Sequence, residues 1–223
     1  AGITSSANLA GARVLFGSYD QYLYCLSTVD GSLIWKLAAD GYIHGTPAIF
    51  EETAAVAGCD GYLRLVCLED GTEREKIELG SYVGASVAVW QDWAYVGTFE
   101  NQVLGIDLKS AAVVWRYESP QRPFPFYASA AIANDRVVVG GRDKMVYALD
   151  LHKGEVLWTY AAGARVDSSP VIVGTRVFFG TGAGVIYALN LDSGAEVWQF
   201  ATGSAILASP SVANQKLVMG STD

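Results

Sequence analysis

Acidic side chains recur at one position of this sequence, and they are the first residues to test for chemistry. They are Asp20, Asp60, Glu100 and Asp143. Carboxylates can ligate Ca²⁺ or act as general acids and bases, but such a site needs several groups that converge on one point. These residues instead recur once per repeat. Because Asp readily bonds nearby backbone N–H groups, we expect them to stabilise turns.

The other chemically capable residues form no recognised constellation. The spacing of Cys59 and Cys67 is not that of a zinc site, and His44 and His152 fall at unrelated positions. Three cysteines cannot all pair within the chain, and we expect buried free thiols. The glycine-rich stretch 180–184 joins two predicted strands and opens no helix, so it does not predict a dinucleotide loop. The motifs of serine hydrolases, zinc proteases and P-loop proteins are also missing from the sequence.

The elements that must position these side chains form a pattern that recurs along the chain. The stretch 183–198, AGVIYALNLDSGAEVW, has four upstream relatives. The aligned stretches end at Trp35, Glu75, Trp115, Trp158 and Trp198, which are 40, 40, 43 and 40 residues apart. Self-similarity at such a period predicts a stacked or radial repeat architecture. A hairpin pattern upstream of each stretch recurs as well, and its sixth copy runs from 206 to 223.

Each repeat is predicted to contain four short strands. In residues 166–202, runs of β-forming residues alternate with short turns, two of which are rich in glycine, as expected for antiparallel strands with tight connections. One such sheet cannot bury both faces alone, whereas radial packing of neighbouring sheets buries them. We therefore predict an all-β fold, a β-propeller of four-stranded antiparallel blades in a single propeller domain or a propeller fragment. The predicted repeats are 1–41, 42–81, 82–124, 125–164, 165–204 and the partial repeat 205–223.

Composition and charge exclude several classes of protein. Hydrophobic residues make up 51% and charged residues 17% of the chain, which suits a folded β-protein and argues against disorder. The net charge of −8 disfavours a nucleic-acid or anionic-membrane surface, because phosphate binding needs clustered Lys and Arg. No apolar run is long enough for a membrane span. The start, AGITSSANLAG, lacks the basic and apolar segments of a signal peptide, so none is predicted in this chain.

Tryptophan closes four of the five aligned stretches, and its position indicates a structural role. An indole ring can cover the neighbouring sheet while its N–H bonds one acceptor. We expect this docking role for Trp35, Trp115, Trp158 and Trp198. Repeat two has Glu75 at the tryptophan position and Leu65 where the other repeats have a small residue, so we expect its outer edge to be the least tightly packed. Repeat three has Ala111 in place of the turn glycine.

The pattern A-x-D-x-x-x-G-x-x-x-W resembles the tryptophan-docking repeat of quinoprotein dehydrogenase-like propellers, the PQQ-like repeat family. The best matches are Ala148, Asp150, Gly154 and Trp158, then Ala188, Asn190, Gly194 and Trp198. The resemblance covers essentially the whole chain and implies a ring of six to eight blades, of which five full repeats and half of a sixth would be a fragment. A self-contained five-bladed ring is the alternative. The family has an enzymatic branch, which holds pyrroloquinoline quinone and Ca²⁺, and a non-enzymatic branch that includes BamB-type scaffolds.

The residues do not favour the enzymatic branch. A calcium–quinone site needs several oxygen ligands, an arginine and a catalytic carboxylate. The innermost strands are predicted to begin at Thr4, His44, Gly84, Tyr127, Asp167 and Leu207, and a single carboxylate is among them. The adjacent cysteines found in the alcohol-dehydrogenase branch are missing from this sequence. We therefore expect no catalytic residues, no PQQ or Ca²⁺ and no other cofactor.

A partner is expected at the mouth of the ring or where the repeat is interrupted. The three extra residues of the long repeat fall in 116–125, RYESPQRPFP, which holds three of the six prolines. This segment suits either a recognition loop or a longer connection between blades. The candidate partner-binding residues on this face are Tyr42, His44, Tyr82, Arg122, Phe124, Phe126, Tyr127, Arg142, Arg165 and Asp167. Aromatic and arginine side chains are typical hot spots, although in a small propeller they can also plug the central channel.

The sequence thus favours a non-catalytic propeller scaffold that binds a protein or peptide on one face. The resemblance and the acidic, cysteine-poor composition suggest a bacterial periplasmic or other extracytoplasmic setting. Two alternatives stay open: a fragment of a PQQ- and Ca²⁺-dependent dehydrogenase, and a ligand-sensing accessory domain of a larger enzyme.

Overall fold

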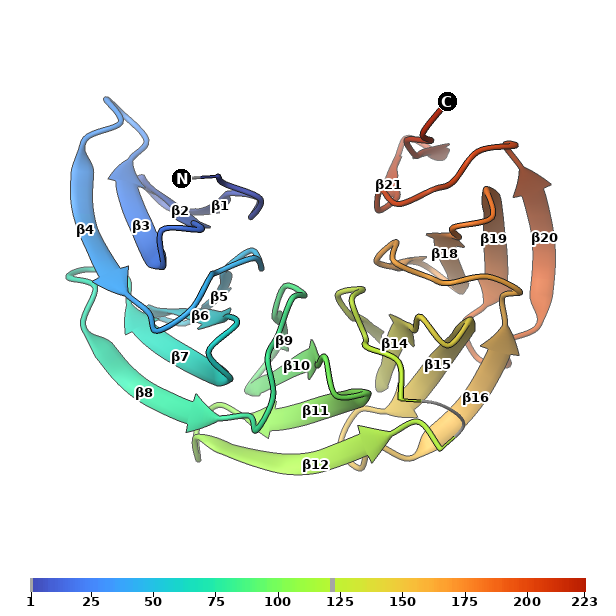
Figure 1. Cartoon of the computed structure of the whole chain (residues 1–223), viewed down its shortest axis with the longest axis horizontal. Coiled ribbons are helices and arrows are strands. Elements are labelled where there is room, and N and C mark those ends of the chain that lie inside the picture. The colour runs from blue at the N-terminus through green and yellow to red at the C-terminus, as the bar shows by residue number, and fades with distance from the viewer. Residues whose placement is uncertain (1, 121–122) are drawn as a thin grey trace. The chain divides into compact units, whose positions relative to one another are not determined.

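The computed structural model describes residues 2–120 and 123–223, and nearly all of its regular structure is short antiparallel strands (Figure 1). Five sheets have four strands each, and a sixth has two. Within every sheet the strands lie side by side in chain order. The predicted all-β fold of five complete four-stranded sheets and half of a sixth is therefore confirmed. The described residues contain no helix that is long and apolar enough to cross a membrane.

The first compact unit comprises the residues up to Phe99 together with Leu104–Val114. Its first sheet contains β1 (Asn8–Ala10), β2 (Arg13–Gly17), β3 (Tyr22–Ser27) and β4 (Leu33–Ala38). The second contains β5 (Ala48–Phe50), β6 (Thr53–Ala57), β7 (Tyr62–Cys67) and β8 (Glu73–Glu78). The third contains β9 (Ala88–Trp90), β10 (Trp93–Gly97), β11 (Gln102–Asp107) and β12 (Ala112–Glu118), and parts of β11 and β12 belong to the second unit.

The second compact unit comprises Glu100–Val103 and Trp115–Asp223. Its first complete sheet contains β13 (Ala131–Ala133), β14 (Arg136–Gly140), β15 (Met145–Asp150) and β16 (Val156–Ala161). The next contains β17 (Val171–Val173), β18 (Arg176–Gly180), β19 (Val185–Asn190) and β20 (Glu196–Ala201). The two-stranded sheet contains β21 (Ser211–Ala213) and β22 (Lys216–Val218).

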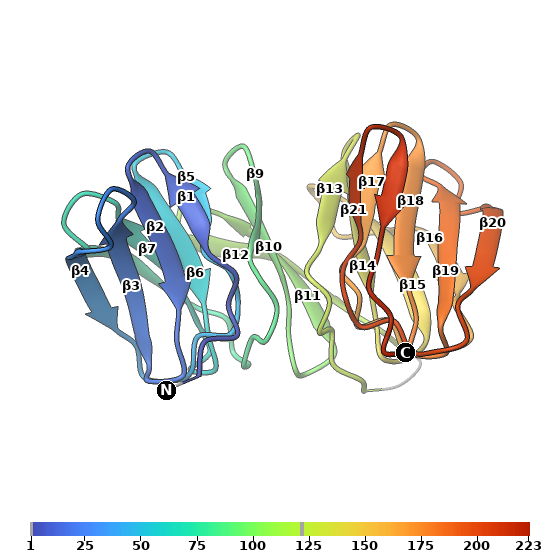
Figure 2. The same ribbon diagram turned by 90° about the horizontal axis from the view of Figure 1, so that it is seen from above.

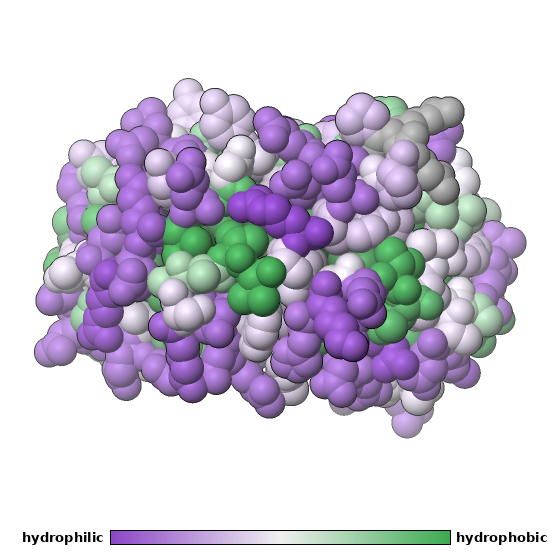
Figure 3. All heavy atoms as spheres, turned by 90° about the horizontal axis from the view of Figure 1, so that it is seen from below, coloured by the Kyte–Doolittle hydropathy of each residue, from purple (hydrophilic) through white to green (hydrophobic). Residues whose placement is uncertain are grey.

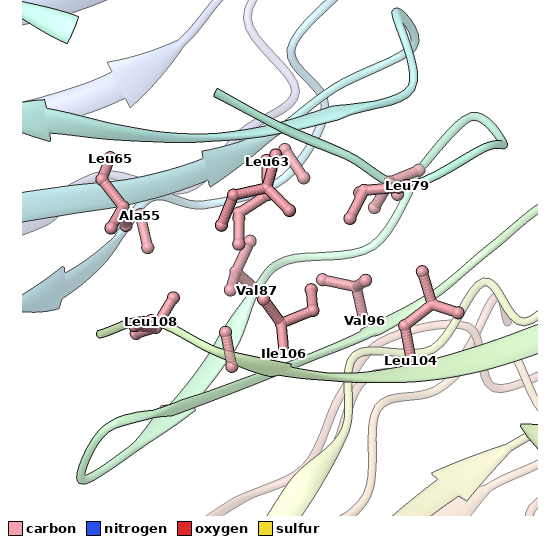
Figure 4. Packing of buried hydrophobic residues seen from close by; sticks show 13 residues of the cluster. Ala55, Leu63, Leu65, Leu79, Val87, Val96, Leu104, Ile106 and Leu108 are labelled. Atoms are coloured by element: carbon pink, nitrogen blue, oxygen red, sulfur yellow. The ribbon is translucent and has the colours of Figure 1, made fainter. Parts of the chain in front are cut away.

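Within each unit the sheets pack face to face, with their short first strands as neighbours (Figure 2). β1 contacts β5 and β5 contacts β9 in the first unit, while β17 contacts both β13 and β21 in the second. One core cluster of the first unit fills the space between its second and third sheets, where Leu63 and Leu65 face Ile106 (Figure 4). In the second unit, Val138 and Val146 of one sheet pack with Leu189 of the next. The apolar runs predicted as strands are therefore the ones that bury the sheet faces.

A β-bulge recurs between the third and fourth strands, next to the position of the closing tryptophan. Trp158 pairs with Ala148 directly before the register shift, and the same register pairs Ala188 with Trp198. A bulge bends a strand and redirects its side chains. Trp158 is only 8% exposed, and its indole Nε1 donates a hydrogen bond to the carbonyl of Leu191 in the next sheet, at 2.8 Å.

The same indole geometry appears at two other closing tryptophans. Trp35 donates to the carbonyl of Leu68 and Trp115 to that of Leu151, each at 3.0 Å. Trp198 is different, since it is 41% exposed and lies over Phe178 of its own sheet.

The outer edge of repeat two is more exposed than those of repeats one, three and four, but it is not the least tightly packed in the described residues. Its fourth strand, β8, has one buried residue, Ile77, as β4, β12 and β16 each have one. The fourth strand without a buried residue is β20. The prediction that this edge is the least tightly packed is therefore wrong. Leu65 is itself 4% exposed and part of the core, so it fills space that a small residue would leave.

Candidate binding face

A repeated backbone arrangement brings three side chains together wherever one sheet leads into the next within a unit. The loop that enters a sheet contains an apolar residue whose N–H bonds a carbonyl in the turn between the second and third strands of the preceding sheet. Ile43 donates in this way to Ser18, Val166 to Gly141 and Ile206 to Thr181. The apolar residue is buried each time. Three other residues lie together at the surface: the two that flank the apolar residue in the chain, and the one that directly follows the accepting residue in the turn. We call these three positions a junction.

The aromatic junction lies in the first unit and consists of Tyr19, Tyr42 and His44. The Tyr19 hydroxyl is 2.9 Å from Nδ1 of His44, and either atom can be the donor, depending on the tautomer. The Tyr19 ring stacks on Tyr42 at 5.2 Å and meets His44 edge-on at 4.7 Å. Tyr42 is 49% exposed. The junction is thus a fixed aromatic platform with one open ring.

The charge of the aromatic junction follows from the burial of its histidine. Burial lowers the pKa of His44 below its ordinary value, since the charged imidazolium is the form that desolvation penalises. No carboxylate is recorded near this ring among the described residues to offset that effect. We therefore expect a neutral imidazole at neutral pH and an uncharged surface.

The next junction of the first unit is formed by Cys59, Tyr82 and Gly84. Val83, the buried residue between the two loop positions, donates its N–H to the carbonyl of Gly58 at 3.2 Å. Tyr82 is 59% exposed and borders a hollow of about 160 Å³ that Asp60 and Tyr62 also line. Burial raises the pKa of the Cys59 thiol, so this cysteine is not an activated nucleophile.

The charged junction lies in the second unit and consists of Arg142, Arg165 and Asp167. Arg142 grips Asp167 with two hydrogen bonds, from Nε to Oδ1 at 2.7 Å and from a terminal nitrogen to Oδ2 at 3.2 Å. Nε of Arg165 lies 3.4 Å from Oδ2 of the same carboxylate. The guanidinium of Arg142 also lies over the ring of Tyr127, 3.8 Å from its centroid. Four of the predicted candidate residues are therefore in one interacting group.

The proline-rich segment contributes less than predicted. Arg122 lies outside the described residues, and Phe124 is 40% exposed. Phe126 is only 1% exposed and packs edge-on against Tyr147, so the prediction that it contributes to a partner surface is wrong. Its place in the repeat is that of the buried Ile43 and Val166, and this alignment could have excluded it from the sequence alone.

The recurring acidic residues bond the backbone of their own turns. Oδ1 of Asp20 accepts the N–H of Tyr22, Oδ1 of Asp60 that of Tyr62, and Oδ1 of Asp143 that of Met145. The other oxygen of Asp20 accepts the hydroxyl of Tyr24 at 2.8 Å. Each carboxylate is thus engaged locally. The residue before the acid in each of these turns, Tyr19, Cys59 or Arg142, belongs to a junction. Tyr19 and Cys59 are not among the candidates predicted from the sequence, although their place directly before the recurring acid could have identified them.

Exposed apolar residues gather on a second kind of surface, the fourth strands. Val114, Val156 and Leu157 are 45–53% exposed, and all three precede a closing tryptophan. Figure 3 shows one side of the molecule, where green hydrophobic patches interrupt a mainly hydrophilic surface. These residues offer contact area but no convergent polar groups, in contrast to the junctions.

Comparison with protein families and solved structures identifies the family and the fold of this chain. The family model described as outer membrane protein assembly factor BamB matches residues 60–222. The crystal structure of BamB from Moraxella catarrhalis superposes with a TM-score of 0.83 over 100% of this chain and 71% of that chain, at 20% identity. The computationally designed Ika8 protein gives a TM-score of 0.84 over 99% of this chain and 68% of that chain, at 14% identity. At such identities the likeness establishes the fold.

Curated relatives match shorter parts of the sequence. The β-alanine-activating enzymes of Mus musculus and Danio rerio are 30% and 32% identical over 106 and 102 residues. These matches cover 44% and 43% of this chain but only 10% and 9% of the enzymes. BamB of Alkalilimnicola ehrlichii is 27% identical over 129 residues, which is 53% of this chain and 33% of that protein. The matched part therefore spans a third or less of each of these relatives.

Proposed function

Because this chain belongs to the family of outer membrane protein assembly factor BamB, we propose that it is a non-catalytic β-propeller scaffold that binds a protein or peptide on one face. In each unit the proposed contact surface consists of that unit's own junctions, and in the second unit it also includes Tyr127. One observation carries the proposal: the backbone of the junctions is constant, while their side chains differ in chemistry from one junction to the next. A repeated frame with variable side chains is the arrangement expected of a recognition surface on a rigid scaffold.

The side chains of the junctions are better suited to binding than to catalysis. Asp167 is only 13% exposed and is shared by Arg142 and Arg165, so its carboxylate is not free to act on a substrate. His44 is bonded to a tyrosine, and no nucleophile is recorded beside it among the described residues. Tyrosine and arginine, by contrast, dominate the energetics of protein interfaces. We therefore assign the exposed Tyr42, Tyr82 and Arg165 to partner contact.

We base the proposed compartment on the family alone. BamB is by name a factor of outer membrane protein assembly, and we extend that extracytoplasmic setting to this chain. The cysteines Cys25, Cys59 and Cys67 form no disulfide in the structure. Stability here would rest on the packed sheets and needs no cross-link.

Site-specific photo-crosslinking in the parent host tests the proposal. We would replace Tyr42 and, separately, Tyr82 by p-benzoylphenylalanine and irradiate living cells. The matched control is Val29, which is 87% exposed but lies in the turn between β3 and β4, at the other end of its sheet. We expect discrete crosslinked products from the two junction positions and none from Val29. Equal crosslinking at all three positions, or at none, would contradict the proposal.

A second candidate function is supported by the similarity to the β-alanine-activating enzymes. The matched part is about a tenth of those proteins, so the resemblance concerns one segment of a larger enzyme. On this view the propeller is an accessory domain that senses a ligand for a catalytic domain elsewhere. The reading frame of the parent gene distinguishes the two, since an adjoining catalytic domain would favour the accessory role.

Quinone chemistry is the alternative that the residues favour least. The junction residues include one carboxylate, and that carboxylate is held by two arginines. Incubation with pyrroloquinoline quinone and Ca²⁺, followed by gel filtration, checks this view. We expect no quinone absorbance to elute with the protein, and a stoichiometric chromophore would overturn the scaffold proposal.

A further inference from the structure

Arg165 is the more exposed of the two arginines in the charged junction, and its guanidinium keeps an open edge. Its Nε faces Asp167 at 3.4 Å, and no other ion pair of Arg165 is recorded in the described part of the chain. The side chain is 53% exposed. A guanidinium is a planar fork with two edges that can each hold a carboxylate through parallel N–H bonds. With Nε turned toward Asp167, the edge formed by the two terminal nitrogens remains available.

The carboxylate that orients Arg165 is itself held in place. Asp167 receives two hydrogen bonds from Arg142, at 2.7 and 3.2 Å, and is only 13% exposed. Arg142 in turn lies on the ring of Tyr127 at 3.8 Å. Tyr127, Arg142, Asp167 and Arg165 thus form a chain of three consecutive contacts. Arg165 is oriented before any ligand arrives, which lowers the entropic cost of binding.

The stem of Arg165 is held from the other side by the turn at Gly182. The N–H of Gly182 donates to the carbonyl of Arg165 at 2.9 Å. A Cβ atom at Gly182 would lie 2.9 Å from Cγ and 3.0 Å from Nε of Arg165. The side chain of Arg165 therefore occupies the space that a side chain at position 182 would need. Gly182 has no left-handed φ, so alanine there would displace the arginine without straining the backbone.

We propose that Arg165 binds a carboxylate of the protein or peptide partner through its free guanidinium edge. This inference rests on the proposed function and names the chemistry of the partner. The junction has two guanidinium groups and one carboxylate, so it carries a local positive charge on a chain of net charge −8. An acidic side chain or a C-terminal carboxylate fits the free edge of Arg165. A polyanion such as nucleic acid would need a wider cluster of cations.

Peptide titration tests the proposal with the purified chain. The probe is acetyl-Phe-Glu-Phe-amide, whose aromatic residues can stack on the guanidinium groups, and its matched control contains Gln in place of Glu. The free acid of the Gln peptide distinguishes a terminal carboxylate from a side-chain one. Binding is followed by the ¹⁵N NMR signal of the Arg165 Nε–H group. We expect the Glu peptide to bind about fivefold more tightly than the Gln amide, as for a favourable exposed ion pair.

Three variants locate the effect. Arg165→Gln should abolish the preference for Glu, followed by the shifts of neighbouring backbone signals. Gly182→Ala retains the charge but moves the guanidinium, so the preference should shrink toward equality. Lys153→Gln removes one positive charge from an exposed turn of the same unit and should leave the preference unchanged. An equal loss in Lys153→Gln and Arg165→Gln would reduce the effect to net charge and overturn the inference.

The inference and the proposed function can fail separately. Equal affinity for the Glu and Gln peptides, or no binding of either, would overturn the role of Arg165. If junction crosslinking persisted in that case and was unchanged by Arg165→Gln, the scaffold function would still stand. Glu-selective binding without any crosslinked partner would support the carboxylate site and contradict the scaffold function.

Discussion

Two contacts between neighbouring sheets solve the same packing problem with different residues. Between the β13–β16 and β17–β20 sheets, Trp158 lies against the turn of the next sheet at Gly194. A Cβ atom on Gly194 would lie 2.6 Å from the indole ring, and φ at this glycine is 68°. We call this arrangement the Trp–Gly contact. Trp35 with Gly71 and Trp115 with Gly154 have the same geometry.

The contact between the β5–β8 and β9–β12 sheets has neither residue. Glu75 takes the register position of the tryptophan, opposite Leu65, where the Trp158 pair has Ala148. Ala111 takes the place of the turn glycine with a left-handed φ of 51°. Leu65 is 4% exposed, and Ala111 packs against the cluster to which Leu65 belongs.

The two departures from the repeat fall on the two sides of a single contact between sheets. Gly71 follows Trp35 by 36 residues, and Ala111 follows Glu75 by the same interval. Where an indole covers the turn, a Cβ has no room. Where the indole is missing, alanine is tolerated and the apolar volume comes from the opposite member of the strand pair. The buried apolar side chain has thus moved to the other member of one cross-strand pair.

Removal of an indole from a Trp–Gly contact should have the largest effect on this comparison. Trp158→Ala deletes a buried ring and the hydrogen bond to Leu191, so we expect a loss of about 3–5 kcal/mol in the free energy of unfolding. The matched control is Trp198→Ala, where the ring is 41% exposed and the loss should be clearly smaller. Urea denaturation followed by circular dichroism measures both. Similar losses in the two variants would show that the ring contact does not stabilise the sheets.

Truncation of Leu65 should reveal where the second contact derives its stability. Leu65→Ala leaves a cavity in the core, and we expect a loss of about 2–4 kcal/mol. Glu75→Ala, at the tryptophan position opposite, should stay within about 0.5 kcal/mol because that side chain is exposed. Urea midpoints of the two variants check the assignment. A larger loss at Glu75 than at Leu65 would mean that the register position, and not the apolar volume, is what matters.

A methyl group at a left-handed turn glycine should cost more where an indole covers the glycine than where nothing does. Gly194→Ala combines a left-handed φ with a clash against Trp158, and we expect a loss of about 2–3 kcal/mol. Gly174→Ala is the matched control, since its φ is 57° and no atom lies within 4 Å of the added methyl. There we expect about 1 kcal/mol from conformation alone. The difference in melting temperature between the two variants isolates the contact with the ring.

The strand order and the sheets could be predicted from the sequence because the same pattern of strands and turns recurs in every repeat. The period, the turn glycines and the closing tryptophans such as Trp158 predicted the four-stranded sheets. The relation between Ala111 and Glu75 was less accessible. Both departures are visible in the sequence, but that they concern one contact depends on knowing that the ring of Trp35 reaches Gly71, in the next repeat.

The candidate site was predictable in its positions and not in its pairings. Alignment of the loops identified Tyr42, His44 and Arg165. It could not predict that Arg142, from the preceding turn, hydrogen-bonds Asp167. Such a pair depends on which loop and turn the backbone holds together. The direction of side chains was also not predicted. Phe126 occupies a buried position, which only comparison with the other loops reveals.

The smallest effect is also the most specific test of the exchange between the two contacts. Ala111→Gly removes a left-handed alanine and a methyl group at the edge of the core, so the change in stability should stay within about 1 kcal/mol. The variant is most useful when it is combined with Glu75→Trp.

A tryptophan introduced at position 75 would meet the Cβ atom of Ala111. Glycine at position 111 would give the new ring the same space that Trp158 has beside Gly194. A double-mutant cycle should therefore show a favourable coupling of about 1 kcal/mol, which increases when Leu65→Ala restores the small partner. Zero coupling would mean that the alanine turn and the missing tryptophan arose independently, and that the two contacts are not versions of one design.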